Sequence, residues 1–213
     1  MTAAANLLAF LGLVVTLLLV WRQSLPGRLR LFVAQSAVLA ALAMVVGMLA
    51  RRPGLVLVGL VFAVVKAWII PRVLRRIAAG MPVRPVPPGS SAGISLLVGG
   101  GLVVAAYVVM TPVKAATALP TEGAIPLAFA MALIGLYLCV TGRDALDHIL
   151  GFLVFENGIF GLAILATYGL PGIVEAGVFL DVLVIVLIME AVVGQVRAEH
   201  ESIEEERLRE LRG

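Results

Sequence analysis

The sequence has 213 residues, of which 62% are hydrophobic and only 14% are charged, with a mean hydropathy of +1.11. A soluble domain carries about 25% charged residues and has no interior that could hold so many apolar side chains, so the composition excludes a water-soluble globular protein. The net charge of +3 is too small to indicate a nucleic acid partner, and the single cysteine, Cys139, excludes an iron–sulfur cluster, which needs several thiolates. The sequence therefore predicts an all-α, polytopic membrane protein with no cofactor and no metal of its own.

Seven stretches are long and apolar enough to cross a bilayer as helices, because a span needs about 20 apolar residues. In chain order they are 3–21, 31–50, 54–72, 93–112, 124–141, 149–168 and 172–195. The first has no basic segment before it and no small-residue cleavage site after it, so we expect a retained span rather than a signal peptide. An odd number of spans places the two chain ends on opposite sides of the membrane.

Positive charge gathers on one side of these spans. It follows the first, third, fifth and last spans, at Arg22, Arg28, Arg30, Arg72, Arg75, Arg76, Arg84, Arg143, Arg197, Arg207, Arg209 and Arg212. The other side carries Lys114 and the pair Arg51 and Arg52, and this pair runs against the bias. The positive-inside rule predicts that the N-terminus lies outside and the C-terminus lies in the cytoplasm.

Composition also divides the chain. The segment "MPVRPVPPGSSA" is rich in Pro and predicts an extended cytoplasmic linker. The tail is polar with Leu and Ile at helical intervals, and predicts a short surface helix that either lies on a partner subunit or is solvated. We expect a three-helix unit, the linker, a connecting helix with its loop, a second three-helix unit and the tail, at 1–80, 81–92, 93–122, 123–196 and 197–213.

The two three-helix units share a pattern that predicts an internal duplication. Arg22 precedes Gln35 by the same spacing with which Arg143 precedes Glu156. Each unit then passes a Pro-Gly turn and enters a helix with one ionisable residue inside it. Chance similarity between apolar helices is the alternative. Elsewhere, the small residues of "VGGGLVV" at 98–104 predict close packing of the connecting helix.

Ionisable side chains lie deep within the predicted spans. Counting about 1.5 Å per helical residue across a core of about 30 Å places Glu156, Asp181, Lys66 and Gln35 in one layer, within about 16 Å of the cytoplasmic face. Each charge at such depth costs about 2.5–3.5 kcal/mol. Low dielectric disfavours the charged form of an acid and of an amine alike, so these groups favour proton exchange along the membrane plane. A static clamp, with Lys66 paired to Glu156 or to Asp181, is the structural alternative.

Further polar residues are candidates for relay or support. Asn157 adjoins the glutamate, and His148 lies at the cytoplasmic end of the same span. Glu175 and Glu190 lie near the ends of the last span, where both reach headgroups, although Glu190 is also placed to form a cytoplasmic mouth. Pro71 removes a backbone donor from the third span and predicts a kink or a bound water there.

A family resemblance follows from three segments. "GFLVFENGIFGLAILATYGLPGIVEAGVFLDVLVIVLIM", the tail "ESIEEERLREL" and the helix "VFAVVKAWIIPRVL" resemble hydrogenase-4 component E, a subunit of energy-converting group 4 nickel–iron hydrogenases. The last three spans also resemble the K-type subunit of respiratory complex I and its antiporter counterpart, which carries a glutamate on each of its last two helices in a lateral proton path. Glu156 matches the first glutamate and Asp181 stands near the second, whereas the first unit has Gln35 and Lys66 instead.

The resemblance implies a non-redox subunit of a hydrogenase-like complex in the cytoplasmic (inner) membrane of a prokaryote. It implies proton or Na⁺ movement through Glu156, Asp181 and Lys66, with no catalytic residue in this chain. The implied partners are antiporter-like and complex I-like membrane subunits and, through them, hydrogenase and iron–sulfur subunits. A subunit of a cation/proton antiporter and a purely structural scaffold are the alternatives.

Overall fold

The structure, a computed structural model, describes residues 2–79, 92–116 and 119–167. The chain divides into two compact units, Met1–Val178 and Phe179–Gly213, and every described residue belongs to the first. The expected linker, the seventh span and the C-terminal tail lie outside the described residues. The described part is helical throughout and contains no strand, which confirms the all-α fold class.

Six helical rods of the described chain are long and apolar enough to cross a membrane, in agreement with the first six predicted spans. The two largest differences from the predicted bounds are that the second rod begins at Leu25 and the third continues to Ala79. Ser24 occupies the N-cap position of the second rod without a side-chain capping bond, and Pro26 lies in its first turn, where the fixed φ of proline suits a helix start. The elements are α1 Thr2–Trp21, α2 Leu25–Leu49, α3 Pro53–Phe62, the π-helix η1 Ala63–Ile69, α4 Ile70–Ala79, α5 Ala92–Ala116, the 3₁₀ turn η2 Glu122–Ala124, α6 Ile125–Val140 and α7 Ala145–Thr167.

A tight turn joins α2 to the rod formed by α3, η1 and α4. Arg51 adopts a left-handed backbone with a φ of 52°, and the N–H of Arg52 donates to the carbonyl of Gly47 at 2.8 Å. This is the bond of a Schellman-type helix end, in which glycine is the usual left-handed residue. An L-residue at this position carries a steric cost.

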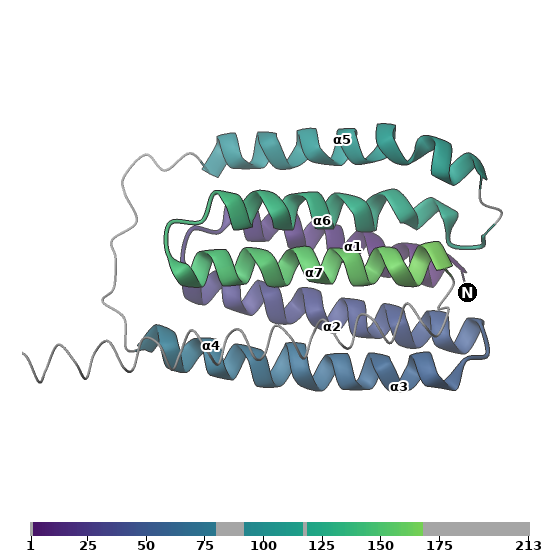
Figure 1. Cartoon of the computed structure of the whole chain (residues 1–213), viewed down its shortest axis with the longest axis horizontal. Helices are drawn as coiled ribbons and strands as arrows, with labels where there is room; N and C mark the ends of the chain where they lie inside the picture. The colour runs from purple at the N-terminus through teal and green to yellow at the C-terminus, as the bar shows by residue number, and fades with distance from the viewer. Residues whose placement is uncertain (1, 80–91, 117–118, 168–213) are drawn as a thin grey trace, which may run out of the picture. The chain divides into compact units, whose positions relative to one another are not determined.

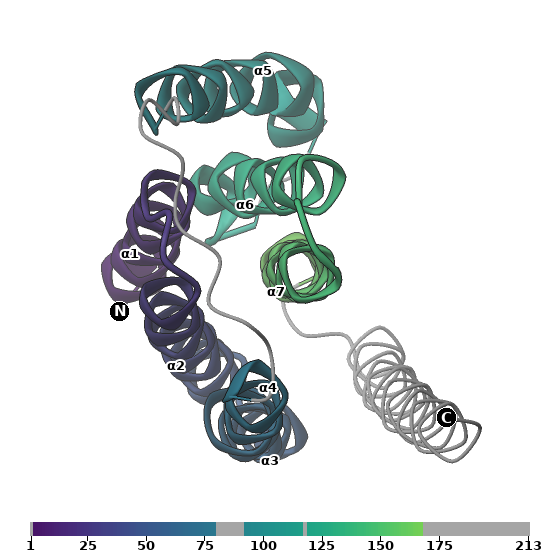
Figure 2. The ribbon, with the colours of Figure 1, turned by 90° about the vertical axis from the view of Figure 1, so that its left-hand side faces the viewer.

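The six rods pack in two rows (Figure 1). One row contains α1, α2 and the α3–α4 rod, and the other contains α5, α6 and α7, as the end-on view shows (Figure 2). The rows meet where α1 packs on α5 and α6 and where α2 packs on α7. The interface between the rows therefore includes α2 and α7, the helices that carry Gln35 and Glu156.

The closest backbone approach is between α6 and α7. A Cβ added at Gly135, Gly151 or Gly158 would strike the backbone of the facing helix, at Phe155, Cys139 and Ala132 respectively. Glycine is required at these points because any side chain would push the helices apart. These three contacts hold α7 against α6, and they therefore fix the position of the backbone that carries Glu156.

The prediction of close packing for the glycines of "VGGGLVV" is confirmed for Gly99, which is buried against Leu17 on α1, and is wrong for Gly100 and Gly101 within the described chain. An added Cβ at Gly100 or Gly101 would meet nothing within 4 Å, and one at Gly99 would meet only a side-chain carbon of Leu17. The reason is position: α5 lies at the edge of its row and exposes most of its surface. Small residues show that close contact is permitted, but not that a partner stands there.

Candidate functional site

A buried ion pair joins the two rows. Lys66, from η1, donates from Nζ to Oε2 of Glu156, on α7, at 2.5 Å. The side chains are 0% and 3% exposed, respectively. A charged pair removed from water in this way sits in a low-dielectric setting, where the attraction is strong but the cost of desolvation is comparable. The sequence predicted that Lys66 could pair with Glu156 or with Asp181, and the structure shows the contact with Glu156.

The backbone around Lys66 departs from a regular α-helix. Pro71 has no N–H, and the N–H of Ile70 reaches back five residues to the carbonyl of Val65. The disturbance predicted from Pro71 therefore takes the form of a seven-residue π-helix, Ala63–Ile69, within a rod that continues to Ala79. Such wide turns are frequent at functional sites, because they re-aim a side chain without ending the helix.

An aromatic stack closes one side of the pair. Phe62 and Phe160 lie with ring centroids 4.3 Å apart and planes 8° from parallel, and both are at most 5% exposed. Phe62 precedes Lys66 by one turn and Phe160 follows Glu156 by one turn, so both rings lie towards the end of the bundle that holds the α2–α3 turn. The Lys66 Nζ stands 5.2 Å from the Phe62 centroid, within the range of a cation–π contact. The stack shields the pair from that end of the bundle.

Beside the pair, neutral polar groups form a hydrogen-bonded seam across α7, α2 and α1. Asn157 donates from Nδ2 to Oε1 of Gln35 and to Oγ of Ser36, each at 3.1 Å. Gln35 donates from Nε2 to Oγ1 of Thr16 at 2.7 Å, and Thr16 donates to the carbonyl of Gly12. The Oδ1 of Asn157 has no hydrogen-bond partner among the described residues. Burial of amides is tolerated here because they bond to one another.

Sequence reasoning missed Thr16 and Ser36, which are fully buried. Hydroxyl residues are common within membrane helices, where they bond across to neighbours or back to their own helix, so their presence alone carries little information. For Ser36, the adjacency to Gln35 was the available signal. For Thr16, nothing in the sequence indicated which helix it would face.

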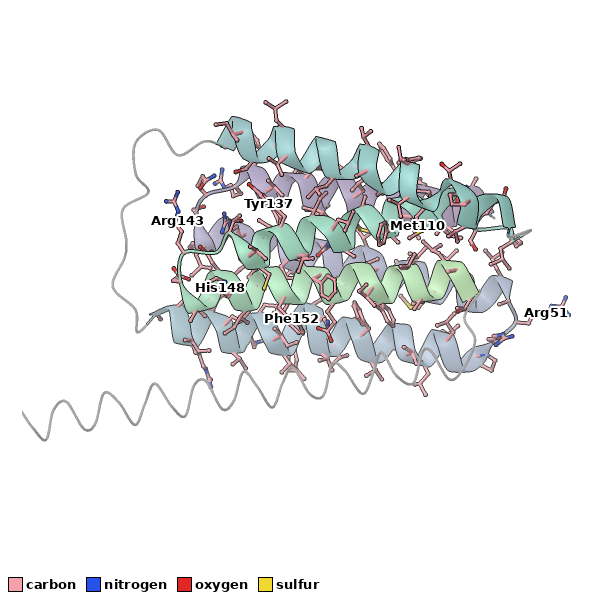
Figure 3. The ribbon with its side chains drawn as sticks, turned by 45° about the horizontal axis from the view of Figure 1, so that its top comes forward. Arg51, Met110, Tyr137, Arg143, His148 and Phe152 are labelled. Atoms are coloured by element: carbon pink, nitrogen blue, oxygen red, sulfur yellow. The ribbon has the colours of Figure 1, made fainter. Side chains whose placement is uncertain are left out.

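His148 lies apart from the pair. Its ring is exposed at the start of α7, and Nδ1 donates to the carbonyl of Cys139 at 2.6 Å. Figure 3 shows His148 and Arg143 near one end of the bundle and Arg51 at the other. At about 1.5 Å per residue, the eight positions to Glu156 span about 12 Å along the helix. The structure therefore leaves His148 outside the hydrogen-bonded cluster, where it ties α7 to the end of α6.

The remaining predicted relay residues, Asp181, Glu175 and Glu190, lie outside the described residues. Within the described ranges, no group of three or more His, Cys, Asp or Glu side chains comes together as a metal site would require. The chemistry that the site offers on its own is exchange of a proton between an amine and a carboxylate.

The chain has relatives among known proteins. It is 35% identical over 204 residues to the uncharacterized protein Rv0085 of Mycobacterium tuberculosis, with 94% of this chain and 93% of the relative covered. It is 25% identical over 152 residues to hydrogenase-4 component E of Escherichia coli and of Shigella flexneri, with 70% of each chain covered. No family model matches the sequence, and no solved structure gives a significant match.

Proposed function

We propose a function for this chain from one established premise, which is that it belongs to the same family as the mycobacterial protein Rv0085. The distant similarity to hydrogenase-4 component E and the six membrane-length helices fit a multi-pass membrane subunit of a hydrogenase-like complex. Its partners are then other membrane subunits of that complex. In finer detail, the proposal is that the chain passes protons laterally within the membrane.

The buried Lys66–Glu156 pair is the observation that carries this proposal. Two forms compete in such a pair: ammonium with carboxylate, and amine with carboxylic acid. Nζ and Oε2 already share a hydrogen bond at 2.5 Å, so the proton has a direct path between the two groups, and a change of charge on a neighbouring group can move it along that path. A pair of this kind passes a proton when a neighbouring relay group gains or loses charge.

The surroundings support a lateral route over a transverse one. The Phe62–Phe160 stack blocks the path towards the α2–α3 turn with two apolar rings. Sideways from the pair, at a similar depth, the neighbouring groups are the polar side chains of Asn157, Gln35 and Thr16, not apolar rings. Asp181 is the further relay candidate that we keep in the proposal from the sequence. Amide side chains conduct protons poorly, so we assign Asn157 and Gln35 to support and not to transfer.

The arrangement also supports the proposed duplication of 1–80 and 123–196. If the two units are repeats, α1 corresponds to α6 and α2 corresponds to α7, and both of these pairs pack between the rows, together with α1 on the connecting helix α5. Contact between equivalent elements is what a self-complementary interface produces. The charge bias adds the orientation: the end with the α1–α2 and α6–α7 turns faces the cytoplasm of a prokaryotic cell, and the N-terminus lies outside.

The test is ion pumping by the assembled complex in vesicles. Glu156→Gln keeps the size of the side chain and a hydrogen bond to Lys66 but cannot exchange a proton. We expect the complex to assemble, judged by co-purification in mild detergent, and to lose pumping. Glu122→Gln, at the α5–α6 end of the bundle and away from the pair, is the matched control and keeps pumping. Unchanged pumping in the Glu156 variant removes this residue from the relay.

Co-purification also separates this function from the antiporter alternative. Recovery of hydrogenase and iron–sulfur subunits supports a hydrogenase-like complex, whereas recovery of antiporter subunits alone contradicts it. The scaffold alternative is separated by the paired replacement of Lys66 and Glu156 treated in the Discussion.

A further inference from the structure

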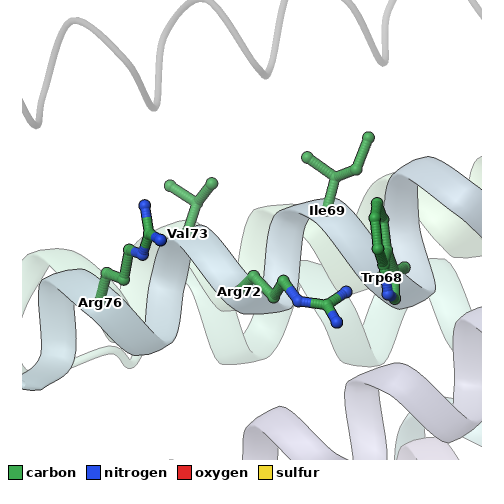
Figure 4. Close-up of a pocket in the computed structure, with 5 residues that line it drawn as sticks. All are labelled: Trp68, Ile69, Arg72, Val73 and Arg76. Atoms are coloured by element: carbon green, nitrogen blue, oxygen red, sulfur yellow. The ribbon is translucent and has the colours of Figure 1, made fainter.

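A second polar feature lies on the exposed face of the α3–α4 rod, separate from the buried Lys66–Glu156 pair. A pocket of about 220 Å³ is lined by Trp68, Ile69, Arg72, Val73 and Arg76 (Figure 4). We call it the Arg72–Arg76 pocket. Its residues recur at helical spacing along one face, so a single face of this rod presents two guanidinium groups, an indole and two branched apolar side chains.

The depth of the pocket places it at the boundary between hydrocarbon and headgroups. Pro53 begins the rod at the opposite end, and at about 1.5 Å per residue Arg72 lies about 28 Å further along. The hydrocarbon core is about 30 Å thick, so Arg72 reaches its far edge and Arg76 lies beyond it. Trp68, which is 57% exposed, sits just inside that edge, where tryptophan is enriched in membrane proteins.

The two arginines are arranged for an anion. The Arg72 guanidinium lies over the Trp68 ring, 4.0 Å from its centroid, a stacked contact that fixes its plane and leaves its N–H edge available. Arg76 follows one turn later on the same side, and both side chains are exposed. Within residues 2–79, 92–116 and 119–167, neither arginine forms an ion pair with an acidic side chain. Guanidinium groups bind phosphate oxygens in a two-pronged geometry.

We propose that the Arg72–Arg76 pocket binds an anionic phospholipid, whose phosphate is attracted by the two guanidinium groups. The apolar lining favours a lipid over a free anion, because Ile69 and Val73 suit an acyl chain and contribute nothing to a soluble phosphate. A general positive-inside role requires charge near the surface but neither a concave shape nor an indole beneath one guanidinium. The ligand class is therefore amphipathic and negatively charged.

Tryptophan fluorescence tests this proposal in vesicles that contain the full chain. The sequence has two tryptophans, so a Trp21→Phe background leaves Trp68 as the reporter. Brominated lipids quench tryptophan on contact. We expect brominated phosphatidylglycerol to quench Trp68 at a mole fraction on the order of tenfold lower than brominated phosphatidylcholine, because the choline of phosphatidylcholine neutralises the phosphate charge that the two arginines attract.

Matched variants assign the preference to the pocket. In the double variant Arg72→Gln/Arg76→Gln the two lipids should quench alike. Arg75→Gln removes the same kind of charge from the same helix but from outside the pocket, since Arg75 donates to the carbonyl of Pro71 at 3.1 Å, and it should keep the preference. Each comparison is between two lipids on one variant, so a change in overall stability does not imitate it.

Four results would overturn the proposal. They are equal quenching by both lipids in the parent, a preference that survives in the double variant, displacement of the brominated lipid by inorganic phosphate, and absence of quenching by either lipid. The third would assign the pocket to a free anion. The fourth would mean that a protein segment covers Trp68.

Discussion

Lys66→Met, Glu156→Leu and the double variant form a cycle that measures what the buried pair does for stability. At an Nζ–Oε2 distance of 2.5 Å and an effective dielectric constant of about 20, the attraction is about 7 kcal/mol. Removal of two ions from water costs several kcal/mol for each. The two terms nearly cancel, so the pair as a whole contributes little net stability.

The single variants do not share this cancellation. Each removes one partner of the pair and leaves the other buried without this contact, which costs up to about 3–5 kcal/mol of unfolding free energy. The double variant removes attraction and desolvation together, and we expect it to unfold within about 1 kcal/mol of the parent. The sum of the single losses should therefore exceed the loss in the double variant by several kcal/mol.

The assay is denaturation by sodium dodecyl sulfate in mixed micelles, followed by circular dichroism. The control cycle uses Arg28 and Asp147, a pair with a similar distance of 2.7 Å but side chains that are 15% and 16% exposed. Its coupling should stay under about 1 kcal/mol, because water screens the attraction. If the losses in the Lys66–Glu156 cycle simply add, the buried contact is absent and the proposed relay loses its basis.

The same double variant decides between relay and scaffold. It keeps a folded bundle in either case, since apolar side chains of similar size occupy the space. Loss of ion pumping in the assembled complex supports proton transfer through the pair. Pumping at the parent level would mean that the charges only bind helices together.

Three further predictions concern the α6–α7 contact, the aromatic stack and the α2–α3 turn. Gly158→Ala forces a Cβ into the α6 backbone and should cost about 1–3 kcal/mol of unfolding free energy, whereas Gly101→Ala, which meets nothing, should be neutral or stabilising; similar losses in both would contradict the close α6–α7 contact. Phe160→Ala removes one ring of the aromatic stack and should speed the collapse of a pH gradient across vesicles that contain the chain, whereas Phe152→Ala, outside the stack, should not; equal leak rates would show that the stack is no barrier. Arg51→Gly relieves the left-handed backbone of the α2–α3 turn and should raise stability by about 1 kcal/mol in the same denaturation assay, while a loss of stability would mean that the Arg51 side chain matters more than its backbone.

The existence of the spans and the candidate relay residues were predictable from sequence for a simple physical reason. Hydrocarbon offers no hydrogen bonds, so each crossing must be an apolar helix of about 20 residues, and any ionisable residue within one stands out. Glu156 and Lys66 were visible in this way. Their depths followed from the constant rise of the helix. The prediction of close packing for the glycines of α5 failed at Gly100 and Gly101, because small size permits contact without specifying a neighbour.

The sequence thus determined how far along its helix each polar residue lies. Only the tertiary structure decided which residues of other helices stand beside it. Lys66 and Glu156 are 90 positions apart, and their pairing depends on how far η1 and α7 are rotated about their own axes. Hydropathy is nearly uniform around these helices, so it does not fix that rotation. The glycine contacts of α6 with α7 and the wide turn before Pro71 fix it instead, and both are properties of packed helices that no single segment contains.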